Sequence, residues 1–391
     1  MEDLMKHVKV LSEDIGPRGS ATPREKEAAS YLAGIMRSAG LEVGLEEFKA
    51  PHTFSWTYLL YYLLGLCGAL LIGGSNGLAL FLGMFALLGF ILENYTVPVL
   101  SRVVPQGRSQ NVIGKLHPSG SVLGRAVIVA HYDSSRSGPN FSPSAVRTFR
   151  QTFLLMTGAL VAVPVLALVK MIPLAGLFGG WVAVVRVLVV VILCFPVLSL
   201  VYRETMGQYT PGANDNASGV SAMLGVAEEL AHHRPRGVEV WFVATGCEES
   251  GSGGMLDLLK RHKSELRGAV IVNLDNLGKG ALKYITGEGM LFSLPAGARA
   301  LQLAEAAARE MGDRVSPHCY RLMSTDALPA LVRGLDAVSV MAFDDRGLLP
   351  NWHWYTDIPA HVDGENLKTA AGFVAGMVAA LDENLAGANK K

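Results

Sequence analysis

Charged residues are scarce in this chain. Asp, Glu, Lys and Arg make up only 17% of its 391 residues, whereas soluble domains usually contain about one quarter. Acidic and basic residues balance at 34 each, so the chain lacks the positive excess that is typical of nucleic-acid-binding proteins. Cysteine is also rare, with four residues that indicate a reducing compartment: Cys67, Cys194, Cys247 and Cys319.

The deficit of charge is concentrated in two hydrophobic blocks. Residues 55–92 contain no charged side chain and turn at "GGSNG" (73–77), a loop-forming cluster. In the second block, residues 151–169 are uncharged and residues 181–202 carry only Arg186, near one end, where it can act as an interfacial anchor. A membrane-spanning helix needs about 20 apolar residues, so the blocks predict four transmembrane helices in two hairpins, with four buried core helices as the alternative.

The two hairpins, at residues 54–100 and 151–202, return the chain to the side it left. We therefore expect residues 1–50, 103–150 and 203–391 to form one polar domain on that side of the membrane. The polar side carries six basic residues near the spans, and the opposite loops carry only Lys170 and Arg186. The six are Lys49, Arg102, Arg108, Arg147, Arg150 and Arg203. This bias predicts a multi-pass membrane protein with a cytoplasmic polar domain, and the absence of an apolar signal core near the N-terminus agrees.

The polar domain alternates short apolar runs with helical patterns. The expected buried strands are residues 125–133, 238–246, 268–276 and 336–344. The expected helices are residues 218–232, 253–264, 296–311, 325–333 and 364–384. This alternation favours a mostly parallel sheet with helices on both faces.

Acids and histidines follow the predicted strands at their carboxyl ends, where such sheets gather ligands. The residues at strand ends are His131, Asp133, Glu248, Glu249 and Asp275, and Asp215, His353 and Asp357 lie in turns. Imidazole and carboxylate ligands together suit a divalent ion and favour zinc. Each residue alone also has a structural explanation. Asp215 could cap a helix, Asp275 could form an Asx turn, and His353 could pack between tryptophans.

Several motifs, in order along the chain, resemble the M28 metallopeptidases, the co-catalytic zinc aminopeptidases. They begin with "LSEDIGPRGSATPREKEAASYLAGIMRSAGLEV", which is similar to the N-terminal segment of that family. They continue through "HYDS", "GANDNASGVSAML", "EESGSGG", "NLDNLG", "STDALPALVRGLDAV" and "HWYTD". The resemblance implies an α/β/α three-layer sandwich around a mixed, mainly parallel sheet.

The resemblance also implies a site with two divalent metal ions, zinc being the expected metal. The implied metal ligands are His131, Asp215 as the bridging residue, Glu249, Asp275 and His353. Glu248 would be the general base, and Asp133 would orient His131. Asp357 would support the loop of His353. Tyr320 would either assist the oxyanion or simply pack.

We therefore expect a membrane-embedded zinc aminopeptidase that acts on short or membrane-proximal peptides. The alternatives are a glutaminyl cyclase, a carboxypeptidase using Arg321 or Arg346 to hold the substrate carboxylate, and a non-catalytic membrane receptor or scaffold. The expected partners are a peptide substrate and the lipid bilayer, without nucleic acid, and homo-oligomerisation stays open. One hydrophobic hairpin separates Asp133 from Asp215, unlike the short connection in soluble members of the family. This insertion beside the metal site argues against borrowing the substrate preferences of secreted relatives.

Overall fold

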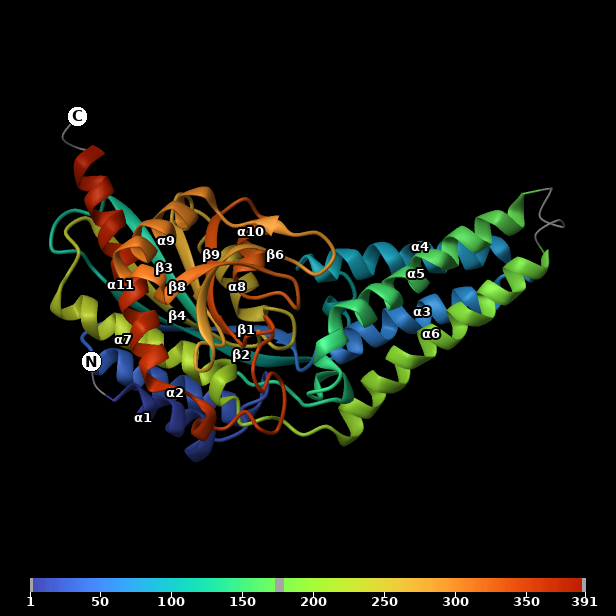
Figure 1. The fold of residues 1–391 in the computed structure, drawn as a ribbon, viewed down its shortest axis with the longest axis horizontal. Coiled ribbons are helices and arrows are strands. Elements are labelled where there is room, and N and C mark those ends of the chain that lie inside the picture. Colours follow the sequence, from blue (N-terminus) through green and yellow to red (C-terminus); the bar gives the residue numbers. More distant parts are fainter. Residues whose placement is uncertain (1–2, 173–178, 389–391) are drawn as a thin grey trace. The chain divides into compact units, whose positions relative to one another are not determined.

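The computed structural model describes residues 3–172 and 179–388 of the chain. Two compact units are distinguished by their internal contacts, and Figure 1 shows the elements of both. Unit 1 consists of Met1–His52, Pro105–Ser137 and Tyr209–Lys391, and unit 2 of Thr53–Val104 and Gly138–Gln208. Residues 138–150 and 203–208, which we assign to the polar domain from the sequence, thus fall in unit 2.

Unit 1 is built on a mixed sheet with a parallel centre. The strand order is β1-β2-β4-β3-β5-β9-β6-β7, and β8 pairs with β6. The central strands β4, β3, β5 and β9 are parallel, whereas β1, β2 and β6 join antiparallel. The strands are β1 Glu42–Pro51, β2 Gln106–Leu116, β3 Gly124–His131, β4 Val238–Thr245, β5 Val270–Leu274, β6 Ala281–Glu288, β7 Leu294–Pro295, β8 Val315–Tyr320 and β9 Asp336–Phe343. The predicted mixed, mainly parallel central sheet is confirmed.

The four central strands are those expected from the apolar runs, and they are mostly hydrophobic because both faces of the sheet are covered. Every residue of β4 and β5 is buried. One face packs against α1 Leu4–Lys9, α2 Pro23–Ser38, α7 Gly219–His232, α9 Ala298–Met311 and α11 Gly364–Ala388. The other face packs against α8 Gly253–Arg261 and α10 Ala327–Val332.

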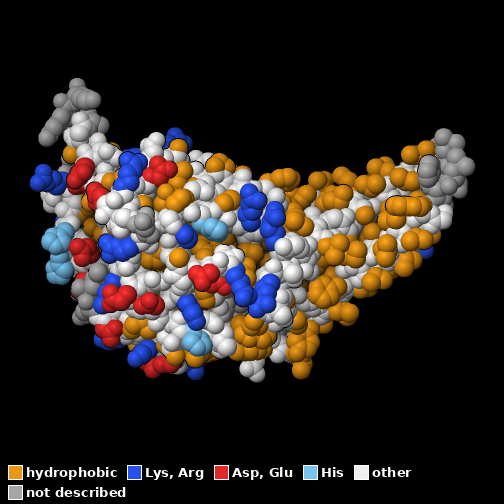
Figure 2. All heavy atoms as spheres, in the orientation of Figure 1, with side chains coloured by type: hydrophobic (Ala, Val, Ile, Leu, Met, Phe, Trp, Pro, Cys, Tyr) orange, Lys and Arg blue, Asp and Glu red, His pale blue; other side chains and the backbone are white. Residues whose placement is uncertain are grey.

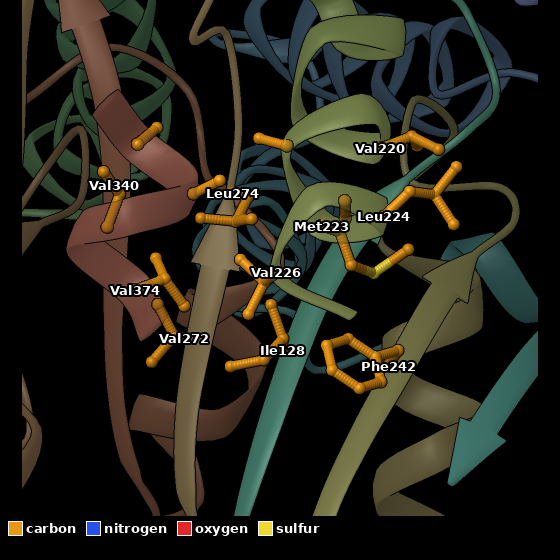
Figure 3. Close-up of a cluster of buried hydrophobic side chains, with 14 of the residues drawn as sticks. Ile128, Val220, Met223, Leu224, Val226, Phe242, Val272, Leu274, Val340 and Val374 are labelled. Carbon is orange, nitrogen blue, oxygen red and sulfur yellow. The ribbon is translucent and has the colours of Figure 1, made fainter. Parts of the chain in front are cut away.

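Alternate residues of each strand supply the two core layers. Ile128, Phe242 and Val272 lie on the α7 side and are close to Met223 and Val226 of that helix (Figure 3). Their neighbours Val127, Val129, Trp241, Val243 and Ile271 pack on the α8 and α10 side. Burial on both faces fixes the register of the strands, since a shift by one residue would exchange the two layers.

The register aligns the carboxyl ends of β3, β4 and β5. His131 pairs with Thr245, and Val129 pairs with Asn273. His131 lies two residues after Val129, and Asp275 lies two residues after Asn273. The two side chains therefore lie at the same height along the neighbouring strands β3 and β5. This edge of the sheet carries the candidate site.

Unit 2 consists of apolar helices, namely α3 Ser55–Leu71, α4 Asn76–Asn94, α5 Phe149–Met171 and α6 Gly179–Met206. Three segments within the described residues are long and apolar enough to cross a membrane: Asn76–Asn94, Val146–Met171 and Gly180–Met206. Helix α3 is shorter, with 17 residues, so the prediction of four transmembrane helices is not confirmed.

The helices of unit 2 expose many large hydrophobic side chains, and Figure 2 shows hydrophobic side chains across the visible face of this unit. Phe81 is 64% exposed on α4, Leu155 57% on α5, and Leu198 68% on α6. An apolar surface of this extent is unfavourable in water and is suited to lipid.

Candidate functional site

His131 and Asp275 come to the site from the ends of neighbouring parallel strands. His131 is the last residue of β3, and Asp275 directly follows β5, where its amide donates to the carbonyl of Val340. Nε2 of His131 lies 3.6 Å from Oδ1 of Asp275. Both residues are buried, so the contact is shielded from water.

Asp215 lies in a turn that is tied to the end of β5 by the two flanking asparagines. Asn216 donates its side-chain amide to the carbonyl of Leu274, at 2.8 Å, and Asn214 donates to the side chain of Asn276. At Gly212, which opens the turn with a φ of +66°, a Cβ would lie 2.6 Å from the side chain of Ser134. The sequence "GANDNASG" therefore presents Asp215 to the strand ends, and the turn continues into α7.

Glu248 and Glu249 belong to the tight turn between β4 and α8. The amides of Gly251 and Ser252 both donate to the carbonyl of Glu248, and the amide of Gly254 donates to that of Gly246. A Cβ at Gly254 would lie 2.5 Å from that carbonyl, which explains a glycine there. The turn directs two acids toward the end of the sheet instead of into solvent.

The five predicted metal ligands converge around Asp215. Its Oδ1 lies 3.2 Å from Nε2 of His131, and its Oδ2 lies 3.1 Å from Nε2 of His353. Nε2 of His353 is also 3.1 Å from Oε2 of Glu249. With Asp275 beside His131, the residues form two sets that share Asp215: His131 and Asp275 belong to one set, and His353 and Glu249 belong to the other.

The predicted general base lies beside this cluster. Oε2 of Glu248 is 4.0 Å from Nε2 of His131, the longest of the ion-pair distances around that ring. Burial raises the pKa of Glu248 well above its usual value, and the negative charges of neighbouring acids, Asp326 first among them, raise it further. A carboxyl group with a raised pKa is a stronger proton acceptor once ionised.

The electrostatics of the cluster favour positive charge. Burial lowers the pKa of His131, but the carboxylates in contact with it raise that pKa well above its ordinary value. The pKa of His353 is raised to about 9, because attraction to Glu249 and Asp215 outweighs the effect of burial. Burial alone would raise the pKa of Asp215, but the imidazoles of His131 and His353 hold that pKa below its usual range.

The donor set fits divalent metal ions. Ligand atoms of His131, Asp215 and Glu249 all lie within 4.8 Å of one another. Among the described residues, Oε1 of Glu249 is buried without a hydrogen-bond partner, which is costly for an ionised carboxylate. A cation bound between Glu249 and Asp215 would satisfy that oxygen, and a mixture of imidazole and carboxylate ligands suits zinc.

Asp133 and Asp357 hold the backbone of the site. Asp133 accepts hydrogen bonds from the amides of Glu248 and Glu249, and its Oδ1 lies 3.5 Å from Nδ1 of His131. The sequence led us to expect Asp357 to support the loop of His353. In the structure its carboxylate accepts from the amides of Asn214 and Asp215, at 2.6 and 3.1 Å. Its contacts thus extend to the turn that carries Asp215.

A buried arginine in the N-terminal segment joins two of the site's loops. The guanidinium of Arg18 donates to the carbonyls of Tyr132, Pro211 and Gly212 at 2.5–2.7 Å, and the residue has no exposed surface. Burial lowers the pKa of Arg18 to about 10, while Asp357 and other acids of the site oppose that change. Arg18 thus fixes the chain beside His131 to the chain before Asp215. Arg18 lies in the N-terminal motif that resembles peptidase family M28, but the sequence alone indicates no role for it.

Three further buried acids near the site were not foreseen from the sequence. Burial raises the pKa of Glu25 and Glu288 to about 8 and that of Asp326 to about 7. Glu288 accepts a hydrogen bond from Thr325. Asp326 accepts one from Thr245, which lies at the end of β4. Glu288 and Asp326 lie in turn-like sequence contexts and Glu25 lies at a helix start, so no local pattern indicates that they are buried.

The remaining predicted residues lie at the end of β8 and in exposed loops. Tyr320 is buried. Burial raises the pKa of its phenol, and the nearby carboxylates of Asp275 and Asp215 raise it further. Arg321 and Arg346, the candidates for holding a substrate carboxylate, are both exposed.

Comparisons with known proteins agree with this description. Residues 201–378 match the sequence model of peptidase family M28. No curated protein sequence gives a significant match to the chain.

Several solved structures share the fold. A zinc aminopeptidase from Bacillus subtilis aligns with a TM-score of 0.56 at 18% identity, over 96% of this chain and 94% of that chain. An aminopeptidase from Aneurinibacillus sp. strain AM-1 gives a TM-score of 0.58 at 16% identity, over 96% and 92% of the two chains. Glutaminyl cyclase from Tannerella forsythia gives 0.58 at 14% identity, over 97% of each chain. The resemblance of this chain to peptidase family M28 is therefore confirmed.

Proposed function

We propose that this chain is a metal-dependent aminopeptidase that hydrolyses the N-terminal residue of short peptides. The observation that carries the proposal is the position of Asp215, whose two carboxylate oxygens each face a different imidazole. One acid shared between two nitrogen ligands is an arrangement that suits a pair of adjacent metal ions.

The proposed ligands divide into two sets. His131 and Asp275 would hold one ion, His353 and Glu249 the other, and Asp215 would bind both. When bound, such a pair of ions lowers the pKa of a water molecule and polarises the carbonyl group of the substrate. Asp133 and Asp357 keep the ligands in place through the backbone contacts described above.

Glu248 is the proposed general base. Its carboxylate would accept a proton from the attacking water and return it to the leaving amine. It lies on the same side of the cluster as His131, and its neighbour Glu249 serves as a ligand instead. The free α-amine of the substrate would be attracted to the acids of the site, with Glu249 and Asp215 as the candidates.

The first test compares matched substrates with and without a free amine. We expect purified protein to release the N-terminal residue from dipeptides and aminoacyl-p-nitroanilides, and to leave their N-acetylated counterparts intact. Treatment with 1,10-phenanthroline should abolish the activity, and added Zn²⁺ should restore it, because the ligands belong to the protein and survive chelation.

Other outcomes of the same assay identify the alternatives. Cleavage of N-blocked dipeptides would favour a carboxypeptidase, although its candidate cations Arg321 and Arg346 are exposed. Release of ammonia from peptides with N-terminal glutamine would favour cyclisation, the activity named for a similarly folded structure. A protein that neither binds zinc nor turns over any of these substrates would favour a non-catalytic receptor.

We also propose that unit 2 is embedded in a membrane and that unit 1 is cytoplasmic. The exposed apolar helices support the first part, and the basic residues near the predicted spans support the second. In sealed inside-out vesicles, added protease should digest unit 1. In right-side-out vesicles unit 1 should be protected until detergent is added. Digestion in the right-side-out vesicles would reverse the proposed orientation.

A further inference from the structure

Three consecutive backbone amides of the turn between β4 and α8 are held by two buried acids from other parts of unit 1. The amide of Cys247 donates to Oε1 of Glu25, at 2.9 Å. The next two amides, of Glu248 and Glu249, donate to the two oxygens of Asp133, at 3.0 and 3.2 Å. Every peptide unit from residue 247 to residue 249 is therefore anchored by an acid.

Glu25 reaches this turn from the first turn of α2. Its amide donates to the hydroxyl of Thr22, which begins the helix, but its own side chain continues past the helix end. Oε2 accepts from the amide of Ala21, and Oε1 accepts from both the amide and the thiol of Cys247. Glu25 has no exposed surface. An acid in the first turn of a helix is ordinarily solvated, so its burial here needs a specific reason.

The backbone of the turn is in need of such support. Cys247 has a φ of +54°, in the left-handed region that side chains other than glycine rarely adopt. The residues that follow are the proposed base Glu248 and the proposed ligand Glu249. A rotation about the backbone bonds of Cys247, whose amide Glu25 holds, would move both carboxylates, and displacements of about 1 Å at reacting groups can cost about 100-fold in rate.

The same N-terminal segment also supports the second acid. Ser20, five residues before Glu25, donates its hydroxyl to Oδ2 of Asp133 at 2.6 Å. Residues 20–25 thus supply one of the two acids that hold the turn, Glu25, and bind the other, Asp133, through Ser20. This segment lies outside residues 201–378, which match the family model, and outside the proposed ligand set.

We propose that Glu25 is a positioning residue of the site, which acts through the amide of Cys247 to fix the directions of Glu248 and Glu249. The inference rests on the proposed metal site and adds a residue to it from a distant part of the chain. Glu25 touches neither substrate nor metal in this proposal, and its effect is transmitted by the backbone alone.

The test is the affinity for Zn²⁺ and the kinetics of the full-length Glu25→Gln variant. Glutamine keeps the volume of the side chain. The amides of Ala21 and Cys247 both need an acceptor, however, and the NH₂ group of glutamine would face one of them as a donor. We expect the zinc dissociation constant, measured by competition with a chelator, to rise about 10–100-fold. We also expect kcat per zinc-loaded molecule to fall by a similar factor, about 10–100-fold, with little change in KM.

The matched control is Glu27→Gln, which removes an acid from an exposed site on the same helix and should leave both quantities unchanged. Glu25→Asp, which keeps the carboxyl group and shortens the reach, should give an intermediate loss. Wild-type zinc affinity and kcat in Glu25→Gln would overturn the proposal. Failure of both Glu25 variants to fold would make Glu25 a stability residue and would overturn it as well.

The two readouts separate this inference from the proposed function. If the unaltered protein binds zinc but hydrolyses no peptide, the peptidase proposal fails while the zinc affinity of Glu25→Gln still tests Glu25. If the unaltered protein is an active peptidase and Glu25→Gln matches it in both measurements, the positioning role alone fails.

Discussion

Glu248→Gln is expected to reduce the peptidase kcat by about 10²–10⁴-fold, the usual contribution of a general base, while zinc content stays unchanged. Glutamine preserves the size of the side chain and lacks a basic oxygen. The amide of residue 248 would still donate to Asp133, so the turn and the neighbouring ligand Glu249 should stay in place. The variant therefore separates proton transfer from metal binding.

The measurement combines steady-state kinetics with metal analysis of the same preparation. Glu383→Gln, a substitution of an exposed acid on α11, is the control and should retain the wild-type rate. Turnover by Glu248→Gln within a few-fold of wild type would exclude Glu248 as the base. A loss of zinc together with activity would instead make Glu248 part of the metal site.

Asp215→Ala is expected to abolish zinc binding at both positions. In the structure Asp215 is the one proposed ligand that faces both imidazoles, so its removal takes an anionic donor from each set. Replacing Asp275 or Glu249 by alanine should weaken one position selectively, because each makes its ion-pair contact with one histidine, Asp275 with His131 and Glu249 with His353. Activity should be lost in all three variants.

Equilibrium dialysis against buffered Zn²⁺ would show the difference as a stoichiometry near zero for Asp215→Ala and near one for the other two. Asp257→Ala is the control, since that carboxylate pairs with Arg261 on α8 and takes no part in the cluster. Two zinc ions retained by Asp215→Ala would exclude a bridging role. Circular dichroism of each variant would establish that the fold is intact.

The fold of unit 1 was largely predictable because its central strands are long apolar runs that end in polar residues. Runs such as "VEVWFVATG" are buried on both faces, and their register brings His131 and Asp275 to the same level. Neighbouring strand ends therefore indicated a shared edge without any knowledge of side-chain contacts. The turns that carry Asp215 and His353 were placed there by the resemblance, since nothing local in their sequence indicates which loops meet.

The contacts that support the site were not predictable in the same way. Arg18 and Glu25 act across more than a hundred residues of sequence, on carbonyls and amides that every residue possesses. A hydrogen bond to the backbone leaves no signature at the partner position. The role of Glu25 was also hard to predict because Thr22 and Glu25 have the spacing of an ordinary helix N-terminus.

Hydropathy located the apolar helices of unit 2 but not their lengths. The uncharged stretch from residue 55 to residue 92 is divided unequally, and α3 ends after 17 residues whereas α4 has 19. The break follows Ile72, where Gly73 has a φ of +95° and its amide is capped by the side chain of Asn76. A cluster of loop-forming residues locates a turn only to within a few residues. A difference of a few residues in helix length also decides whether a helix can span a membrane.

Anomalous diffraction at the zinc absorption edge, from crystals of the protein, would show directly whether two zinc ions bind at Asp215. We predict two anomalous peaks on either side of Asp215, one beside His131 and Asp275 and the other beside His353 and Glu249. Their separation should be about 3.5–4 Å, the spacing that allows one water molecule to contact both ions. A single peak, or zinc bound away from Asp215, would contradict a two-metal site in this chain.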